Sequence, residues 1–374
     1  MNIYYDENMP FAKEFFNDLG NLTAFSGREL TAEKVEEADV LLVRSITKVN
    51  ESLLSKNKHL SFVGTATIGV DHIDQKYLAD HNVTFTAAPG CNATSVAEYV
   101  ISALVVMAER YLINIFSLTV GIIGAGNTGS RLSEKLDVLG IKHVTCDPLL
   151  QAAGDKRNFV ELEQALACDV ISLHVPITSV GEHATYHLLD YNRLSQLTDD
   201  QILINACRGE VIDNKALLSL KEQGQKTKLI LDVWENEPNI LLSLIEHTEI
   251  ATAHIAGYSL EGKARGTEML YQALCKKLEI PVMLSLNDFL PIADINQVNI
   301  MAKVDNVVLS SLVKCVYDVR RDDAIFRQKL QTKGFDHLRK TYPVRREFSS
   351  MGISSSNSQE NSVACKLGFS YYPS

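Results

Sequence analysis

Three charged side chains in the middle of the chain, Arg208, Glu237 and His254, have the types that oxidation of a hydroxy acid requires. A histidine can accept the proton of a hydroxyl group, because its pKa lies near neutral pH. A carboxylate beside the imidazole would fix its tautomer, and a planar guanidinium would bind a substrate carboxylate through two parallel hydrogen bonds. Together the three types predict hydride transfer from a 2-hydroxy acid, with His254 taking the proton.

The positions of these residues predict that they meet. Each follows an apolar segment that is typical of a strand, at residues 201–205, 229–233 and 249–253. In a doubly wound parallel sheet, ligands bind beyond the carboxyl ends of the strands. The alternatives are a helix-capping arginine, an exposed turn glutamate and a core histidine.

A glycine-rich turn at residues 124–129, Gly-Ala-Gly-Asn-Thr-Gly, predicts a dinucleotide-binding site. Gly124 would allow the tight turn, Gly126 would let a pyrophosphate approach, and Gly129 would let the helix pack closely on the strand. Asn127 and Thr128 complete the turn between an apolar strand and a helical segment.

A second strand after this helix ends on an acid, Asp147. A carboxylate at this place accepts hydrogen bonds from the adenosine ribose and repels a 2′-phosphate. The predicted cofactor is therefore NAD.

Apolar strands alternate with helical segments over most of the chain, which predicts parallel sheets covered by helices. The expected strands are 2–5, 40–43, 62–65, 84–86, 120–123, 143–147, 170–174, 201–205, 229–233 and 249–253, and the expected helices include 11–19, 32–37, 50–55, 95–116, 130–139 and 255–279. After Pro281 we expect a helix at 297–319 and a loop at 349–362, which is rich in Ser and Asn. The segment Arg345-Arg346 is expected in a charged turn or, across a dimer, at a substrate phosphate.

The expected architecture is α/β with two doubly wound parallel-sheet domains and a small α+β C-terminal domain. A flavodoxin-like substrate domain would comprise residues 1–95 with 256–285, and a Rossmann NAD domain residues 96–255. Residues 286–374 would form a dimerisation domain, because this segment is too charged to fold independently and its apolar face needs a partner surface. A regulatory ligand-binding module is the alternative.

Composition excludes several other classes. The formal net charge of −10 argues against nucleic acid and anionic membranes as partners, since both reward a basic surface. The seven cysteines are scattered without a C-x-x-C pair, which favours free thiols in a reducing cytoplasm. The amino terminus has no signal-peptide pattern, and the most apolar stretch, 99–107, is too short to span a bilayer. His183 and His187 are four residues apart but lack a third ligand, so no metal is expected.

Longer motifs indicate which family of proteins the chain resembles. The segments 205–213, 231–238 (Leu-Asp-Val-Trp-Glu-Asn-Glu-Pro) and 254–257 (His-Ile-Ala-Gly) resemble the D-isomer-specific 2-hydroxyacid dehydrogenases. Segments 64–71 and 92–98 resemble the substrate-domain and hinge motifs of that family. Further similarity, to a branch acting on a phosphorylated hydroxy acid, lies in 6–10, 43–50, 88–92, 258–266 and 317–323.

The resemblance implies specific roles. Arg208 and Glu237 would be catalytic, and His254 would donate or accept the proton. Substrate contacts would come from Ser45, Thr67 and Tyr258, and the NAD pocket would be lined by Asp147, Val175, Ala206, Cys207, Asp232 and Gly257. A homodimer through the C-terminal domain is also implied.

A phosphate-binding role for Arg44 follows from the residues themselves. Arg44 ends the strand at 40–43 with hydroxyl side chains beside it, and a phosphate requires a cation and several donors. The expected substrate is therefore a small phosphorylated 2-hydroxy acid. Two alternatives remain: a dehydrogenase for 3-phosphoglycerate or glycerate, and an NAD-sensing binding protein without turnover.

Overall fold

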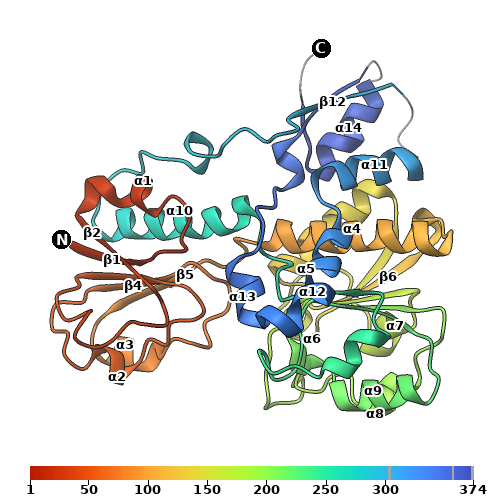
Figure 1. Ribbon diagram of the computed structural model, residues 1–374, viewed down its shortest axis with the longest axis horizontal. Coiled ribbons are helices and arrows are strands. Elements are labelled where there is room, and N and C mark those ends of the chain that lie inside the picture. The colour runs from red at the N-terminus through yellow and green to blue at the C-terminus, as the bar shows by residue number, and fades with distance from the viewer. Residues whose placement is uncertain (302–304, 356–357, 372–374) are drawn as a thin grey trace. The chain divides into compact units, whose positions relative to one another are not determined.

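The computed structural model describes residues 1–301, 305–355 and 358–371 (Figure 1). The chain forms two compact units, the first made of residues 1–92 and 259–292, the second of residues 93–258 and 293–374. The second unit therefore holds both the segment expected to bind NAD and the C-terminal segment. The three domain boundaries expected from the sequence stay a prediction.

The first unit contains a parallel five-stranded sheet with the order β2-β1-β3-β4-β5. Its strands are β1 (Asn2–Asp6), β2 (Asn21–Phe25), β3 (Val40–Val43), β4 (Phe62–Thr65) and β5 (Thr84–Ala87), and its helices are α1 (Ala12–Phe16), α2 (Glu51–Leu54), α3 (Gln75–Asp80) and α10 (Leu260–Lys277). This order confirms the flavodoxin-like expectation. The strand β2 was not predicted, and the helix expected at 32–37 is wrong, because this segment forms turns.

Side chains that alternate along the strands build two cores in this unit. Leu42 packs with α1 and α10 on one face, where the rings of Phe15 and Tyr271 lie 5.2 Å apart. Leu41 packs on the opposite face with Leu53 and Leu78 of α2 and α3. Both faces of the sheet are thus covered, as expected for a buried parallel sheet.

The second unit contains a parallel six-stranded sheet with the order β11-β10-β9-β8-β6-β7. Its strands are β6 (Thr119–Ile123), β7 (Lys142–Cys146), β8 (Val170–Leu173), β9 (Ile202–Asn205), β10 (Lys228–Leu231) and β11 (Ile250–Ala251). An isolated parallel bridge joins Phe159 to Thr145 of β7, so the strand that would complete a Rossmann order is reduced to one residue pair.

Helices cover both faces of this sheet (Figure 1). The helices are α4 (Ala93–Tyr111), α5 (Asn127–Leu139), α6 (Pro148–Ala152), α7 (Leu162–Leu166), α8 (Tyr191–Ser195) and α9 (Asn214–Glu222). Ile122 of β6 packs with α4 and α5, whereas its neighbour Ile123 packs with α8 and α9 on the opposite face. Short 3-10 helices are η1 (Asn17–Leu19), η2 (Ile115–Ser117), η3 (Gly209–Val211), η4 (Leu242–His247), η5 (Leu286–Asp288) and η6 (Phe348–Ser350).

The C-terminal segment corrects two expectations. It contains β12 (Gln297–Ile300), α11 (Asn306–Val316), α12 (Val319–Lys333), α13 (Phe335–Lys340), β13 (Gly352–Ser355), α14 (Ser358–Leu367) and β14 (Ser370–Tyr371). The single helix expected at 297–319 is wrong, because its first residues form a strand. The loop expected at 349–362 contains β13 and part of α14, while residues 356–357 lie outside the described residues.

A buried ion pair between α4 and α5 is hydrogen-bonded to the C-terminal segment. Lys135 Nζ of α5 lies 3.1 Å from Glu98 Oε1 of α4 and donates to the Leu367 carbonyl. The other Glu98 oxygen accepts the Phe348 N–H. Burial raises the pKa of Glu98 to about 7, against the opposing charge of Lys135.

Arg345 differs from both expectations for the segment Arg345-Arg346, whereas the place of Arg346 stays a prediction. Arg345 is only 2% exposed and donates to the Ala256 and Ser95 carbonyls of its own unit, so it is neither in a solvated turn nor free to reach a partner. Its guanidinium lies 3.6 Å from the centre of the Tyr317 ring.

Within the described residues, no helix combines the length and hydropathy needed to cross a membrane.

Candidate active site

The glycine-rich turn leads from β6 into α5 in the second unit. Gly124 has φ 94°, which favours glycine, and a Cβ at Gly129 would lie 1.9 Å from the Gly124 carbonyl oxygen. A Cβ at Gly126 would meet nothing within 4 Å. Asn127 and Thr128 begin α5, so backbone N–H groups at a helix start are available to an anion such as a pyrophosphate.

Asp147 follows β7 and lies against this turn. One carboxylate oxygen accepts the Ala125 N–H at 2.8 Å, and the other caps α6 by accepting the Leu150 N–H at 3.0 Å. A partly buried carboxylate therefore lies beside the glycine turn, and its role toward a ribose stays a prediction.

Val175 and the turn 206–208 lie at the ends of the next two strands. A Cβ on Gly124 would come within 2.9 Å of the Val175 side chain, so this residue borders the glycine turn. Asn205 fixes the other turn, because its side chain bonds Cys207 and the Arg208 carbonyl, while Ala206 packs on the core. Burial raises the pKa of Cys207 to about 11, so its thiol stays protonated.

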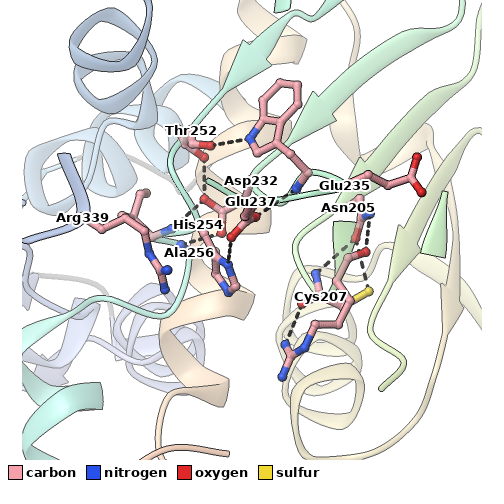
Figure 2. Close-up of polar contacts among 12 residues, drawn as sticks. Asn205, Cys207, Asp232, Glu235, Glu237, Thr252, His254, Ala256 and Arg339 are labelled. Carbon is pink, nitrogen blue, oxygen red and sulfur yellow. Dashed lines mark hydrogen bonds and ion pairs between the residues drawn. The ribbon is translucent and has the colours of Figure 1, made fainter. Parts of the chain in front are cut away.

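Asp232 organises the turn that carries His254. Its buried carboxylate accepts hydrogen bonds from Thr252 Oγ1 at 2.6 Å, from Ile255 N–H at 2.8 Å and from Ala256 N–H at 2.9 Å (Figure 2). Burial raises the pKa of this carboxyl above its ordinary value. This supporting role of Asp232 was not predicted from the sequence. Gly257 lies in the same turn.

His254 and Glu237 are bonded to each other. His254 Nδ1 lies 2.7 Å from Glu237 Oε2, and Glu237 Oε1 accepts the Trp234 N–H at 3.0 Å (Figure 2). Burial would raise the pKa of Glu237, but the adjacent His254 and the nearby Arg339 guanidinium outweigh it and lower that pKa. The carboxylate is therefore held ionised against the ring.

The backbone at His254 is held in an uncommon conformation. Its φ is 56°, in the left-handed region that L-residues rarely adopt, and its N–H donates to the Asp232 carbonyl at 2.7 Å. Such conformations persist where surrounding contacts enforce them, and they cluster at functional sites.

Arg208 follows β9, and Glu237 follows the neighbouring strand β10. Their turns are in contact, since a Cβ on Gly209 would lie 2.0 Å from the Trp234 carbonyl. Because β9, β10 and β11 are neighbours, the structure brings Arg208, Glu237 and His254 to one sheet edge. The Arg208 Nη1 donates to the Cys207 carbonyl at 2.7 Å.

The predicted substrate contacts are divided between the two units. In the first unit, Arg44 donates to the Asn8 carbonyl at 3.2 Å, Ser45 is exposed, and Thr67 bonds Thr65 at 2.7 Å. Tyr258 belongs to the second unit, where its hydroxyl accepts a hydrogen bond from Arg339 at 2.9 Å.

Two cationic side chains, Lys263 and Arg339, were not identified as candidates from the sequence. Lys263 of α10 is half-buried, and burial together with the charge of Arg44 lowers its pKa to about 8. Its position in the 258–266 segment was the available signal. Arg339 lies in α13, in a part of the sequence that carries no recognisable motif.

His187 has a different setting from the one considered for a metal. Its Nε2 lies 2.7 Å from Glu235 and its Nδ1 3.7 Å from Asp213, whereas His183 does not take part in this group. Asp213 also caps α9, and Glu235 also accepts the Asn214 N–H. These bonds tie together the turns that follow β9 and β10.

Comparisons with known proteins agree with this architecture. The family described as D-isomer specific 2-hydroxyacid dehydrogenase, NAD binding domain, matches residues 101–256, and a domain of unknown function matches residues 289–368. A D-lactate dehydrogenase from Aquifex aeolicus in complex with NAD and lactic acid has a TM-score of 0.61 and 26% identity, covering 74% of this chain and 96% of that one. An NAD-bound 3-phosphoglycerate dehydrogenase from Entamoeba histolytica, at 22% identity and a TM-score of 0.64 over 78% of this chain and 99% of that one, shares the fold.

The fold and the strand-end residues therefore define an NAD-dependent 2-hydroxyacid dehydrogenase. Two curated relatives narrow the class: erythronate-4-phosphate dehydrogenases of Colwellia psychrerythraea and Tolumonas auensis are 59% and 54% identical, each over 99% of both chains. The chain belongs to the erythronate-4-phosphate dehydrogenase family.

Proposed function

We propose that this protein oxidises 4-phospho-D-erythronate to 2-oxo-3-hydroxy-4-phosphobutanoate with NAD, a step of pyridoxal 5′-phosphate biosynthesis. The observation that carries the chemistry is the 2.7 Å contact between His254 Nδ1 and Glu237. Because this contact engages Nδ1, the other ring nitrogen, Nε2, is available to accept the proton of the substrate.

The residues present fit the cofactor. The glycine turn offers helix N–H groups to the pyrophosphate, and Asp147 offers a carboxylate to the ribose. We assign Gly124, Gly126, Asn127, Thr128, Gly129, Asp147, Val175, Ala206, Cys207, Asp232 and Gly257 to the NAD pocket. When bound, NAD supplies the acceptor for the hydride that leaves C2.

The protein residues handle the proton and the anionic groups. His254 Nε2 takes the proton of the C2 hydroxyl, and the ionised Glu237 stabilises the resulting imidazolium. Arg208 binds the substrate carboxylate and polarises the carbonyl that forms at C2. The C–H electron pair leaves as hydride, so the carbon is oxidised by two electrons and charge is balanced.

The phosphate and the remaining substrate atoms are assigned to four further residues. Arg44 supplies a cation, and Ser45, Thr67 and Tyr258 supply hydroxyl groups. In the first unit, the charge of Arg44 already lowers the pKa of Lys263. The two cations, Arg44 and Lys263, repel each other, and a bound phosphate dianion would relieve this repulsion. This supports phosphate recognition by the first unit.

A panel of substrates tests the function directly. Formation of reduced NAD is followed by absorbance with 4-phospho-D-erythronate, 3-phosphoglycerate, glycerate and D-erythronate. We expect kcat/KM to be highest for 4-phospho-D-erythronate. Equal or better turnover of 3-phosphoglycerate would reject the substrate, and NAD binding without turnover of any acid would favour a sensing protein.

We further propose a cytoplasmic homodimer joined through the C-terminal segment. Met301, Val307 and Val344 are 79%, 71% and 71% exposed in the single chain, which leaves apolar surface for a second copy to cover. Light scattering of the full chain should give twice the mass of one chain, and charged substitutions at Val307 and Val344 should shift it to the monomer mass.

A further inference from the structure

The helix α13 brings an arginine to the catalytic residues from the segment that matches a domain of unknown function. Arg339 Nη2 donates to the Tyr258 hydroxyl at 2.9 Å, and its guanidinium lies 5.5 Å from the centre of the Tyr258 ring. Arg339 is also close enough to Glu237 to lower the pKa of that carboxyl. Figure 2 shows it near His254.

The position of Arg339 is fixed by apolar packing. Leu338 and Phe335 of α13 are buried in the same core as Trp234, three residues before Glu237. The Phe326 ring joins them, with its centre 5.7 Å from that of Trp234 and 6.1 Å from that of Phe335. Arg339 therefore extends from a rigid support toward the site.

The guanidinium has donors that the protein does not use. Among the described residues, Tyr258 accepts the one hydrogen bond that Arg339 donates, and the buried Nε has no partner there. A buried donor without an acceptor is costly, and guanidinium groups bind phosphate through parallel hydrogen bonds. The half-buried side chain is suited to an anionic ligand.

We propose that Arg339 binds the phosphate end of the substrate, so that the C-terminal segment supplies a specificity residue to the active site of its own chain. This inference rests on the proposed function and adds a second cation, besides Arg44, to the residues assigned to the phosphate. In Figure 2, Cys207, whose carbonyl accepts a hydrogen bond from Arg208, lies on the opposite side of His254 from Arg339. An acid held by its carboxylate at Arg208 and by its hydroxyl at His254 extends its far end toward Arg339.

Two substrates that differ only in the phosphate separate this role from others. We would measure kcat and KM for 4-phospho-D-erythronate and D-erythronate with the wild type, Arg339→Gln and Arg339→Lys. In Arg339→Gln, we expect KM for the phosphorylated acid to rise by roughly 10-fold to 100-fold, as for loss of hydrogen bonds to a charged group. KM for D-erythronate should rise much less than KM for the phosphorylated acid, and Arg339→Lys should recover part of the loss.

Lys340→Gln is the matched control, because Lys340 is the exposed neighbour on the same helix and loses the same charge. It should leave the phosphate preference unchanged. Thermal melting and NAD affinity of Arg339→Gln should match the wild type, which shows that the variant folds.

Two outcomes overturn the proposal. Equal losses on both acids would mean that Arg339 binds the carboxylate or supports catalysis. A shifted pH profile with unchanged KM would mean that it acts through Glu237. A wild type without preference for the phosphorylated acid would instead reject the proposed function, so the two failures are distinguishable.

Discussion

Glu237 holds the imidazole of His254 by one carboxylate oxygen while its other oxygen accepts the N–H of Trp234, at 2.7 Å and 3.0 Å respectively. The carboxylate is thus fixed at both ends, and with it the orientation of the ring. A carboxylate in this position keeps a proton on Nδ1 in the neutral ring and leaves Nε2 to receive one.

The first prediction concerns this pair. His254→Ala should lower kcat by ~10²–10⁴ with NAD affinity little changed, because the proton acceptor is lost. Glu237→Gln should also lower kcat, since an amide cannot stabilise the imidazolium by charge. Single-turnover kinetics and NAD titration check both. Near-normal turnover of His254→Ala would contradict the assignment.

Arg208→Lys tests recognition of the substrate carboxylate. A lysine keeps the charge but cannot form the planar pair of hydrogen bonds, so KM should rise and kcat should fall because the carbonyl is less polarised. Steady-state kinetics with the preferred acid would measure both. Kinetics identical to the wild type would rule out the carboxylate clamp.

Two glycines of the same turn should respond differently to alanine. A Cβ at Gly129 would lie 1.9 Å from the Gly124 carbonyl, so Gly129→Ala should reduce stability by about 1–3 kcal/mol or more through overpacking. A Cβ at Gly126 meets nothing within 4 Å, so Gly126→Ala should keep the stability and weaken NAD binding. Urea unfolding and NAD titration of both variants separate the roles. A stable Gly129→Ala variant with normal NAD affinity would contradict the packing argument.

The sheet edge could be predicted from sequence because local patterns determine it. Buried parallel strands are continuous apolar runs, and their carboxyl ends are marked by the charged residues that follow. Arg208, Glu237 and His254 were therefore found together. The helix at 32–37 failed for a related reason: one short amphipathic stretch does not determine a helix without tertiary packing.

The C-terminal segment could not be predicted in the same way. Residues 349–362 are rich in Ser and Asn, yet Met351 and Ile353 are fully buried in the core beside α4 and α5. Pairing of β13 with β12 and β14 joins residues far apart in the sequence. The place of Arg339 depends on the packing of Phe335 and Leu338 around Trp234, which no local pattern encodes.

The last prediction is a pH dependence of stability that arises at the end of β8. His174 is 9% exposed, its Nε2 lies 2.8 Å from Ser172 Oγ, and its backbone carbonyl lies next to Gly124. Burial lowers the pKa of this histidine to about 4. Between about pH 6.5, where an unfolded histidine titrates, and pH 4, the unfolded chain binds the proton and the folded chain does not.

Stability contributed by neutral His174 is therefore complete above about pH 6.5 and decreases as the pH falls toward 4. The loss amounts to about 3 kcal/mol, from 1.36 kcal/mol for each pKa unit. His174→Gln has no titrating ring, so its free energy of unfolding should fall less than that of the wild type between pH 7 and pH 4.5. Urea unfolding of both proteins at the two values measures the difference, and His183→Gln serves as control for an exposed histidine. Parallel losses in the wild type and His174→Gln would show that His174 does not remain neutral in the folded protein.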